Sequence, residues 1–481
     1  MKILFRADAS ASIGSGHVMR CLVLADQLKQ RGHATGFLTS AADPAWLEYI
    51  SQTRGHPVHA VASAENANET LALLHAEFTH WLVVDHYGLD RTWEQACAAQ
   101  VGKILAIDDL ANRPHACDVL LDYNESHQAG HYQHLVPRDC EFLLGCRHAL
   151  IKPDFARQPA RQTWSLRNIL VNFGSYDHRR QTGKVIRASQ RADLGTCRLL
   201  ILSGRDENLR AEIAPLLKPG VIECQGFTDN MAQLLAQTDL AIGAGGTSVY
   251  EKCAMGVPTI AITTADNQLE GARALHALGA LHWLGEAASV DENDLLACLL
   301  EFKNNPPRLQ ALSDQARRLC DGQGSERVCA FMEQSLLLRP ATAVDCDWLH
   351  AWRNHEQNRR HSNDTTSIDI HTHRQWFADS LRNPHRHLLI GLLGGVDVAV
   401  VRLDKDGARA RISIYLKPGL TGQGLGSRTL LETSRWCRKT LPQTTCIEAE
   451  IQPANHASLR SFAKAGYKPV GPLFELHLSA Y

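Results

Sequence analysis

The 481-residue sequence contains no apolar run close to the ~20 residues that cross a bilayer as a helix. It also lacks an excess of one charge, because 50 Lys and Arg stand against 51 Asp and Glu, a net charge of −1. This balance argues against nucleic acid or an anionic membrane as a partner. Residues 1–5 lack the apolar segment and cleavage site of a signal peptide. We therefore expect a cytoplasmic protein with small-molecule substrates.

Metal and disulfide spacings are also missing. The 14 cysteines are scattered, and the nearest two, Cys140 and Cys146, are six residues apart, so there is no C-x-x-C motif. Among the 24 histidines are two H-x-H pairs, at 371/373 and 385/387, but no H-E-x-x-H motif. We interpret these histidines as core or solvated residues and predict a reduced protein without a bound metal.

The length predicts about three domains. In residues 1–150, short apolar runs at Ile3–Phe5, Trp81–Val84 and Ile104–Ile107 alternate with helical segments, which is typical of an open parallel α/β sheet. Residues 151–338 begin with a predicted linker at 151–167 and repeat this alternation, with strands expected at Ile169–Phe173, Leu199–Leu202, Leu240–Ile242 and Thr259–Ile262. Two such halves predict a ligand cleft between them.

Residues 339–481 suit one further domain of α+β organisation. A strand and two helices are expected first. Further strands are then expected at Leu388–Leu392, Val398–Leu403 and Ile412–Leu416, before a glycine-rich turn into a helix.

A first candidate site, Ile13-Gly14-Ser15-Gly16-His17, follows the first predicted strand. Gly14 and Gly16 let the backbone approach a ligand closely, and a helix N-terminus attracts anions such as a pyrophosphate. Met19 stands where the dinucleotide fingerprint needs a third glycine, which disfavours a Rossmann dehydrogenase. The helix start favours a neutral imidazole at His17, as a general base requires. A helix start that carries histidine by chance is the alternative.

A second glycine-rich turn, residues 243–251, lies between a predicted strand and a helix. Glu251 follows Thr247 by four residues, on the same helical face, where its carboxylate could accept hydrogen bonds from ribose hydroxyls. The candidate UDP-sugar contacts in the turn are Gly245, Gly246, Thr247 and Ser248. A turn without a ligand is again the alternative.

A third loop, Leu420–Ser427, offers consecutive N–H groups to a pyrophosphate at the start of a helix. It resembles the acetyl-CoA loop of the GNAT acetyltransferase superfamily, Q/R-x-x-G-x-G/A, although Thr421 replaces the usual first residue. The resemblance covers about residues 339–481 and implies acetyl-CoA as co-substrate. The implied contacts are Tyr415 and Leu416 on the preceding strand, Gln423, Gly424, Gly426 and Ser427 in the loop, and Asn455.

The same resemblance leaves the acid and the base of acetyl transfer open. Phe462 falls where a tyrosine often protonates the leaving thiolate, so Tyr467 or water is left for that role. Glu448 and Glu450 are candidate bases, against the alternative of ordinary strand carboxylates. Residues 352–354, Trp-Arg-Asn, resemble the subgroup that acetylates amino-sugar nucleotides.

Residues 1 to about 335 resemble the UDP-2,4-diacetamido-2,4,6-trideoxy-β-L-altropyranose hydrolases of pseudaminic acid synthesis, relatives of GT-B glycosyltransferases. The resemblance implies a GT-B-like pair of Rossmann-like domains in which His17 activates water and Glu251 and Asn267 bind the UDP-sugar. The chain departs from these relatives near Ser175, where a second glycine is usual. The strings that carry the resemblance are Ile13–Cys21, Asp85–Asp90, Ile107–Asp109, Cys117–Asp118 and Leu121–Asn124.

Together these motifs predict a bifunctional enzyme of pseudaminic acid synthesis. It would acetylate the 4-amino group of a UDP-4-amino-4,6-dideoxy-sugar and then release UDP from the diacetamido sugar with inversion. Two alternatives stay open: a GT-B glycosyltransferase fused to an acetyltransferase, and a non-catalytic sensor of UDP-sugar or acetyl-CoA.

Overall fold

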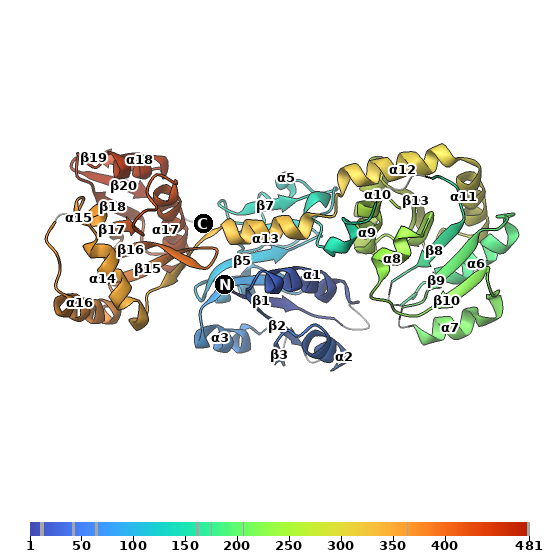
Figure 1. Ribbon diagram of the computed structural model, residues 1–481, viewed down its shortest axis with the longest axis horizontal. Helices are drawn as coiled ribbons and strands as arrows, with labels where there is room; N and C mark the ends of the chain where they lie inside the picture. Colours follow the sequence, from blue (N-terminus) through green and yellow to red (C-terminus); the bar gives the residue numbers. More distant parts are fainter. Residues whose placement is uncertain are drawn as a thin grey trace.

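The computed structural model describes residues 1–9, 14–40, 44–62, 66–159, 163–174, 176–204, 206–362 and 364–478. These residues form three sheets in three successive regions, which we call the first half, the second half and the C-terminal domain. The first half lies in the middle of the molecule, between the C-terminal domain and the second half (Figure 1).

The sheet of the first half has seven parallel strands in the order β3-β2-β1-β4-β5-β6-β7. Its central strands are apolar and buried, as expected of a parallel sheet that helices cover on both faces. The strands are β1 (Lys2–Ala7), β2 (Ala34–Ser40), β3 (Val58–Val61), β4 (Thr79–Asp85), β5 (Val101–Ile107), β6 (Val119–Asp122) and β7 (Glu141–Leu144). The helices are α1 (Gly16–Gln30), α2 (Pro44–Glu48), η1 (Tyr49–Thr53), α3 (Ala67–Ala76), α4 (Arg91–Ala98), α5 (Ala129–Tyr132), η2 (Cys146–His148) and η3 (Pro153–Phe155).

The sheet of the second half has six parallel strands in the order β10-β9-β8-β11-β12-β13. They are β8 (Asn168–Asn172), β9 (Arg198–Leu202), β10 (Ile222–Gln225), β11 (Leu240–Ala244), β12 (Thr259–Thr263) and β13 (His282–Glu286). The helices are α6 (Gln181–Arg191), α7 (Glu207–Ile213), η4 (Ala214–Leu216), α8 (Met231–Ala236), α9 (Ser248–Met255), η5 (Asp266–Gln268), α10 (Leu269–Ala277), α11 (Glu292–Asn304) and α12 (Pro306–Leu319). The strands predicted in both halves are confirmed.

After α12 the chain returns to the first half. Helix α13 (Gly324–Gln334) packs on α1, as Figure 1 also shows. Its buried Val328 and Met332 belong to the same apolar core as Val18 of α1. Gly324 makes this return possible, because a Cβ there would lie 2.4 Å from the backbone oxygen of Ala149. The first half is therefore completed by residues far along the sequence.

The C-terminal domain has a mixed seven-stranded sheet in the order β14-β15-β16-β17-β18-β20-β19, in which only the β17–β18 pair is parallel. The strands are β14 (Leu336–Pro340), β15 (Arg386–Leu393), β16 (Val396–Asp406), β17 (Arg409–Leu416), β18 (Cys446–Glu450), β19 (Lys468–Val470) and β20 (Leu473–His477). The helices are η6 (Ala343–Asp345), α14 (Cys346–Asn354), α15 (Glu356–Arg359), α16 (Ile370–Arg382), α17 (Leu425–Thr440) and α18 (His456–Lys464). Within the described ranges, no helix is both long and apolar enough to span a bilayer.

Candidate active sites

The first candidate site forms at the carboxyl edge of the first sheet. Helix α1 begins at Gly16, so His17 lies in its first turn, and the residue is only 7% exposed. Its Nδ1 lies 2.6 Å from Oδ1 of Asp85, the last residue of β4. Because β1 and β4 are parallel neighbours, their carboxyl ends meet at the same edge and bring α1 to Asp85.

Arg20 fixes the protonation of this pair. It donates from Nε to Asp85 Oδ2 and from Nη2 to Asp85 Oδ1, each at 2.6 Å. Burial alone would raise the pKa of Asp85, but Arg20 and His17 hold it well below its usual range. An ionised carboxylate only accepts hydrogen bonds, so Nδ1 of His17 donates, and in a neutral imidazole the lone pair is then on Nε2. This is the tautomer that can accept a proton from water.

Tyr87 joins His17 to the second half. Its ring contacts the imidazole edge-on, with centroids 4.5 Å apart. Asn267 in η5 donates from Nδ2 to the Tyr87 hydroxyl at 3.1 Å. The sequence analysis included Asp85 and Tyr87 in the Asp85–Asp90 string that carries the resemblance, but it assigned neither residue a role. The available signal is that both lie at or just beyond the carboxyl end of a buried strand.

The N-termini of α1 and α9 face each other across the two halves. A Cβ placed on Gly16 would lie 3.9 Å from Thr247 Oγ1, and α9 begins at the next residue, Ser248. The Thr247 side chain makes no capping hydrogen bond to α9. Two helix starts thus direct their positive ends into the space between the halves, where an anion would be stabilised.

The glycines predicted in these turns meet different surroundings. Gly14 has φ +81°, a backbone conformation that few other residues adopt. A Cβ on Gly245 would lie 3.0 Å from Thr263 Cγ2, whereas Gly246 borders the Gln268 side chain. Ile13 and Ser175, which the sequence motifs include, lie outside the described residues.

Glu251 lies in the first turn of α9 and is half-buried. Burial raises its pKa to about 7, although Lys252 and Lys152 oppose this effect. Burial also lowers the pKa of Lys252 to about 8. Glu251 is therefore a carboxyl group whose charge changes near neutral pH.

Further polar contacts hold the halves together beside this site. Tyr250 of α9 donates from its hydroxyl to Asn124 Oδ1 at 2.6 Å. Asn124 in turn donates from Nδ2 to the backbone oxygen of Asp109 at 3.2 Å, and Asp109 accepts from Arg20 at 2.9 Å. A chain of hydrogen bonds thus connects the second half, through Asn124 and Asp109, to Arg20 beside His17.

The second candidate site lies in the C-terminal domain, where β17 and β18 diverge. The two strands pair over Arg409–Arg411 and Cys446–Glu448. Beyond these pairs β17 continues along β16 to Leu416, whereas β18 continues along β20 to Glu450. Tyr415 and Leu416 lie on the diverging part of β17, where the Leu416 carbonyl accepts from Asn358 Nδ2 at 3.1 Å. Beyond its pairs with β18, the backbone of this edge can pair with an extended ligand.

The glycine-rich loop leads from this divergence into α17. Gly422 and Gly424 have φ of +84° and +74°, and Gly424 stands at the N-cap of α17, where no side chain caps the helix. Gln357 of α15 supports the loop by donating to Thr421 Oγ1 at 2.7 Å and accepting from the Gly419 N–H at 3.1 Å. The uncapped helix start and the left-handed glycines suit a bound pyrophosphate.

The other predicted cofactor contacts surround this loop. Ser427 donates to the Gly424 carbonyl at 3.0 Å and is buried, whereas Gln423 is exposed. Asn455 caps α18, because its Oδ1 accepts from the Ser458 N–H at 3.1 Å. That bond leaves the Nδ2 group of Asn455 to donate to a ligand.

The candidate acid and bases of acetyl transfer differ in their surroundings. Glu448 accepts from Arg409 and Arg411, and these bonds lower its pKa, which weakens it as a base. Glu450 is exposed at the end of β18. Tyr467 is buried against Phe462, and burial raises the pKa of its phenol well above the usual range.

One group of possible metal ligands occurs among the described residues, at Cys446, Glu475 and His477. Arg409 already pairs with Glu475, and His477 is largely exposed. The group lies at the closed end of the β17–β18 pair, away from both candidate sites.

Comparison with known proteins defines the class of this chain. Residues 169–327 match the family model of the glycosyltransferase family 28 C-terminal domain, and residues 335–468 match that of the acetyltransferase (GNAT) domain. The fold of 69% of the chain matches MurG of Acinetobacter baumannii, with TM-score 0.50, 15% identity and 99% of that chain covered. It also matches the glycotransferase of kitacinnamycin, with TM-score 0.51, 16% identity and 98% covered. The chain is a GT-B-like protein fused to a GNAT acetyltransferase domain, as predicted.

Two curated relatives match the GT-B-like part. The chain is 33% identical over 178 residues to the UDP-2,4-diacetamido-2,4,6-trideoxy-β-L-altropyranose hydrolase of Campylobacter jejuni. The aligned region covers 37% of this chain and 61% of the hydrolase. It is 26% identical over 346 residues to the spore coat polysaccharide biosynthesis protein SpsG of Bacillus subtilis, covering 68% of this chain and 96% of SpsG. The chain is a homologue of this hydrolase, although the match spans about three fifths of the hydrolase's length.

Proposed function

We propose that this chain catalyses two consecutive reactions on one sugar nucleotide. The C-terminal domain acetylates the 4-amino group of a UDP-4-amino-4,6-dideoxy-sugar that already carries a 2-acetamido group, and the GT-B-like part hydrolyses the resulting UDP-2,4-diacetamido-2,4,6-trideoxy-β-L-altrose. The observation that carries the hydrolytic step is the buried pair of His17 and Asp85, 2.6 Å apart, next to two facing helix N-termini. The resemblance to the Campylobacter hydrolase supplies the sugar.

In the hydrolytic step His17 is the general base. Its Nε2 accepts a proton from water as the water oxygen bonds to the anomeric carbon, and the bond from that carbon to the UDP oxygen breaks. Asp85 accepts from Nδ1 throughout and stabilises the imidazolium that forms. Water attacks from the face opposite to the leaving group, so the sugar product has the inverted configuration.

The leaving UDP carries away the bonding electron pair, and the helix starts of α1 and α9 stabilise the charge that develops on its phosphates. UDP is a stable anion, so this electrostatic help replaces a strong proton donor. On the second half, the Glu251 carboxylate accepts from the ribose hydroxyls, while Asn267 is placed beside Tyr87 at the sugar.

In the acetylation step the uncapped start of α17 and the loop Gly422–Gly424 bind the pyrophosphate of acetyl-CoA. The open edge of β17 at Tyr415 and Leu416 holds the pantetheine, and Asn455 donates to it from Nδ2. Bound acetyl-CoA would supply the acetyl group: the neutral amine bonds to the thioester carbonyl carbon, the carbon–sulfur bond breaks, and the sulfur takes up a proton and leaves as free thiol. Two arginines lower the pKa of Glu448 and so weaken it as a base. This favours Glu450 or water as the proton acceptor.

A glycosyltransferase is the second candidate, and the match to the glycosyltransferase family 28 C-terminal domain favours it. In that case a sugar or lipid hydroxyl would take the place of water beside His17. Phosphorus NMR with the purified protein separates the two. UDP release from the diacetamido sugar nucleotide in buffer alone supports hydrolysis, whereas release only after an acceptor is added supports transfer.

The same measurement tests the order of the two steps. Starting from the 4-amino sugar nucleotide, UDP is expected only when acetyl-CoA is present. The His17→Ala variant is expected to stop at the acetylated UDP-sugar while it still releases free thiol from acetyl-CoA. Release of thiol without UDP from either sugar by the unmodified protein would overturn the hydrolase assignment.

A further inference from the structure

The C-terminal domain contacts the first half through β14, whose Leu337 shares the core of the first half, and through one charged face of α17, which we call the docking face. The face consists of Glu432, Arg435, Arg438 and Lys439. Glu432 pairs with Lys103 at 3.1 Å, and the two residues are only 7% and 2% exposed. A buried pair of this kind is costly to break, because removing one partner leaves an uncompensated charge.

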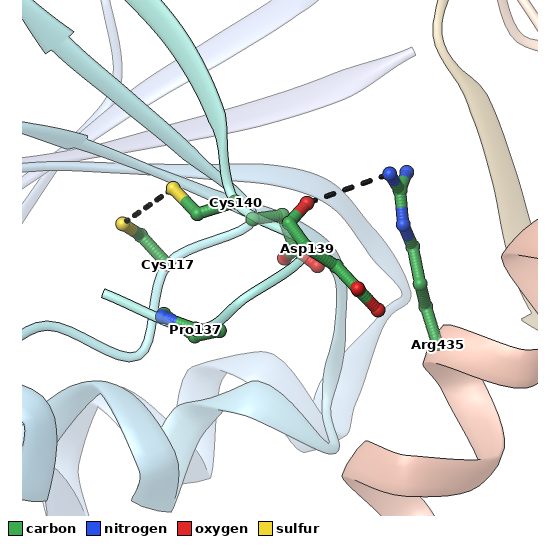
Figure 2. A pocket seen from close by; sticks show the side chains of 6 residues that line it. Cys117, Pro137, Asp139, Cys140 and Arg435 are labelled. Carbon is green, nitrogen blue, oxygen red and sulfur yellow. Dashed lines mark hydrogen bonds between the residues drawn. The ribbon is translucent and has the colours of Figure 1, made fainter. Parts of the chain in front are cut away.

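The remaining contacts of the docking face are also to the first half. Arg435 pairs with Glu141 at 3.2 Å. It also donates to the backbone oxygen of Asp139 at 3.4 Å, as Figure 2 shows. Arg438 pairs with the Asp139 carboxylate. Lys439 pairs with Asp118 at 3.4 Å. Charges that alternate in sign across the boundary therefore fix the C-terminal domain in one position.

All the partners of the docking face lie at the amino-terminal edge of the first sheet. Lys103 is near the start of β5, Asp118 directly precedes β6, and Asp139 and Glu141 stand at the start of β7. These strands are parallel, so their starts share one edge. Met1, which precedes β1 at the same edge, contacts Gly395 of the C-terminal domain.

The hydrolytic site lies at the opposite edge. Asp85 ends β4, and Asp109 and Tyr123 follow the ends of β5 and β6. Strand β5, with seven residues, separates the two edges by about 20 Å at about 3.3 Å per residue. The acetyl-CoA loop belongs to the docked domain, where Gly424 precedes the docking face by two turns of α17. Figure 1 shows the same order, with the first half between the C-terminal domain and the second half.

We infer that the acetylated sugar nucleotide passes from one site to the other through solvent, not through a channel. The inference rests on the proposed function, because it concerns the intermediate shared by the two steps. A seven-stranded sheet with its covering helices fills the space between the sites, and the docking face holds the acetyltransferase on the far side. The fusion therefore keeps the two activities at equal amounts without raising the local concentration of the intermediate at the second site.

Isotope dilution with the full chain tests this. The 4-amino UDP-sugar is supplied with labelled acetyl-CoA and about a tenfold excess of unlabelled diacetamido UDP-sugar, and the label in the released sugar is measured. Exchange through solvent predicts that the labelled share falls about tenfold, in line with the pool, and that UDP release begins with a lag when no unlabelled sugar is added. Labelled sugar that stays undiluted, or release without a lag, would overturn the inference.

A variant with the docking face reversed, Arg435→Glu with Arg438→Glu, provides the matched control. Solvent transfer predicts the same lag and the same label dilution in this variant as in the unmodified chain. A lag that lengthens only in the variant means that docking delivers the intermediate, and the inference fails. Failure of the proposed function looks different, because neither labelled nor unlabelled sugar would then release UDP.

Discussion

His17 Nδ1 and Asp85 Oδ1 lie 2.6 Å apart, and this contact joins the first turn of α1 to the end of β4. Arg20 keeps Asp85 ionised, so the carboxylate fixes which imidazole nitrogen carries the hydrogen. The base of the proposed reaction is thus determined by a residue that is itself fully buried.

Asp85→Asn is expected to lower kcat for UDP release by about 10²–10⁴-fold with little change in KM. The amide can donate to His17 Nδ1, which places the hydrogen on Nε2 and removes the base. Steady-state kinetics on the diacetamido UDP-sugar measure the effect. Acetyl transfer by the same protein should be unchanged and reports correct folding. Asp193→Asn, at a side chain that is 95% exposed, is the matched control and should leave both activities intact.

Tyr87→Phe is expected to raise KM for the UDP-sugar about three- to tenfold, since one hydrogen bond contributes about 0.5–1.5 kcal/mol. The change removes the hydroxyl that accepts from Asn267 but retains the ring that contacts His17. Asn267→Ala should raise KM at least as much. If the double variant is no worse than the worse single variant, the two residues act through their shared bond. Fully additive effects would contradict that coupling.

Glu251 should make UDP-sugar binding depend on pH near neutrality. With its pKa at about 7, a carboxylate that must be ionised to accept the ribose bonds predicts about tenfold weaker binding at pH 6 than at pH 8. Calorimetric titration with a UDP-sugar, whose diphosphate diester does not titrate in this range, measures it. Glu251→Gln keeps the size and should bind with a nearly flat pH profile, leaving only the contribution of Lys252. If UDP-sugar binding by Glu251→Gln depends on pH as strongly as binding by the unmodified chain, a group other than Glu251 causes the dependence.

Glu251 should also make stability depend on pH, but in the opposite direction: ligand binding strengthens as the pH rises, whereas the free energy of unfolding falls. Its pKa is raised on folding, so the stabilisation is fully present below the ordinary pKa of 4.5 and is lost as the pH rises through about 7. Glu251→Gln should therefore unfold like the unmodified chain at pH 4 and be the more stable of the two at pH 8. Denaturant unfolding at both pH values measures the difference.

Gly424→Ala is expected to weaken acetyl-CoA binding about tenfold or more. A Cβ at φ +74° strains the backbone by about 1–2 kcal/mol and turns N–H groups of the loop away from the pyrophosphate. Gly407→Ala is the matched control, because Gly407 also has a positive φ, +56°, but lies in the turn between β16 and β17. Equal losses of stability with a loss of acetyl-CoA binding only at Gly424 would support the assigned role.

Local patterns predicted the elements of this fold because each strand and turn depends on nearby residues. Buried apolar runs identified β1, β4 and β5, and glycines before helices identified the starts of α9 and α17. The positive φ of Gly424 explains why that loop was recognisable, since the backbone there requires glycine.

The pairing of His17 with Asp85 was beyond such patterns, because it depends on β1 and β4 lying side by side although β2 and β3 separate them in sequence. The role of Tyr87 was beyond them for a related reason, since its hydroxyl accepts from Asn267, which lies 180 residues away in the second half. In the sequence, the docking face of α17 has the pattern of an ordinary solvent-exposed charged helix surface. No residue near it in the sequence indicates that Lys103 pairs with Glu432 there.

Because α13 packs on α1, the core of the first half can be completed only late in the synthesis of the chain. Val18 and Leu22 of α1 leave the ribosome early, but Val328 and Met332, which cover them, follow some tens of seconds later at about 5–20 residues per second. During that interval the nascent first half carries an apolar helix face with no partner. A gene fragment that stops after the first sheet would leave this face open permanently, so a stand-alone GT-B-like unit has to extend through Gln334, the end of α13.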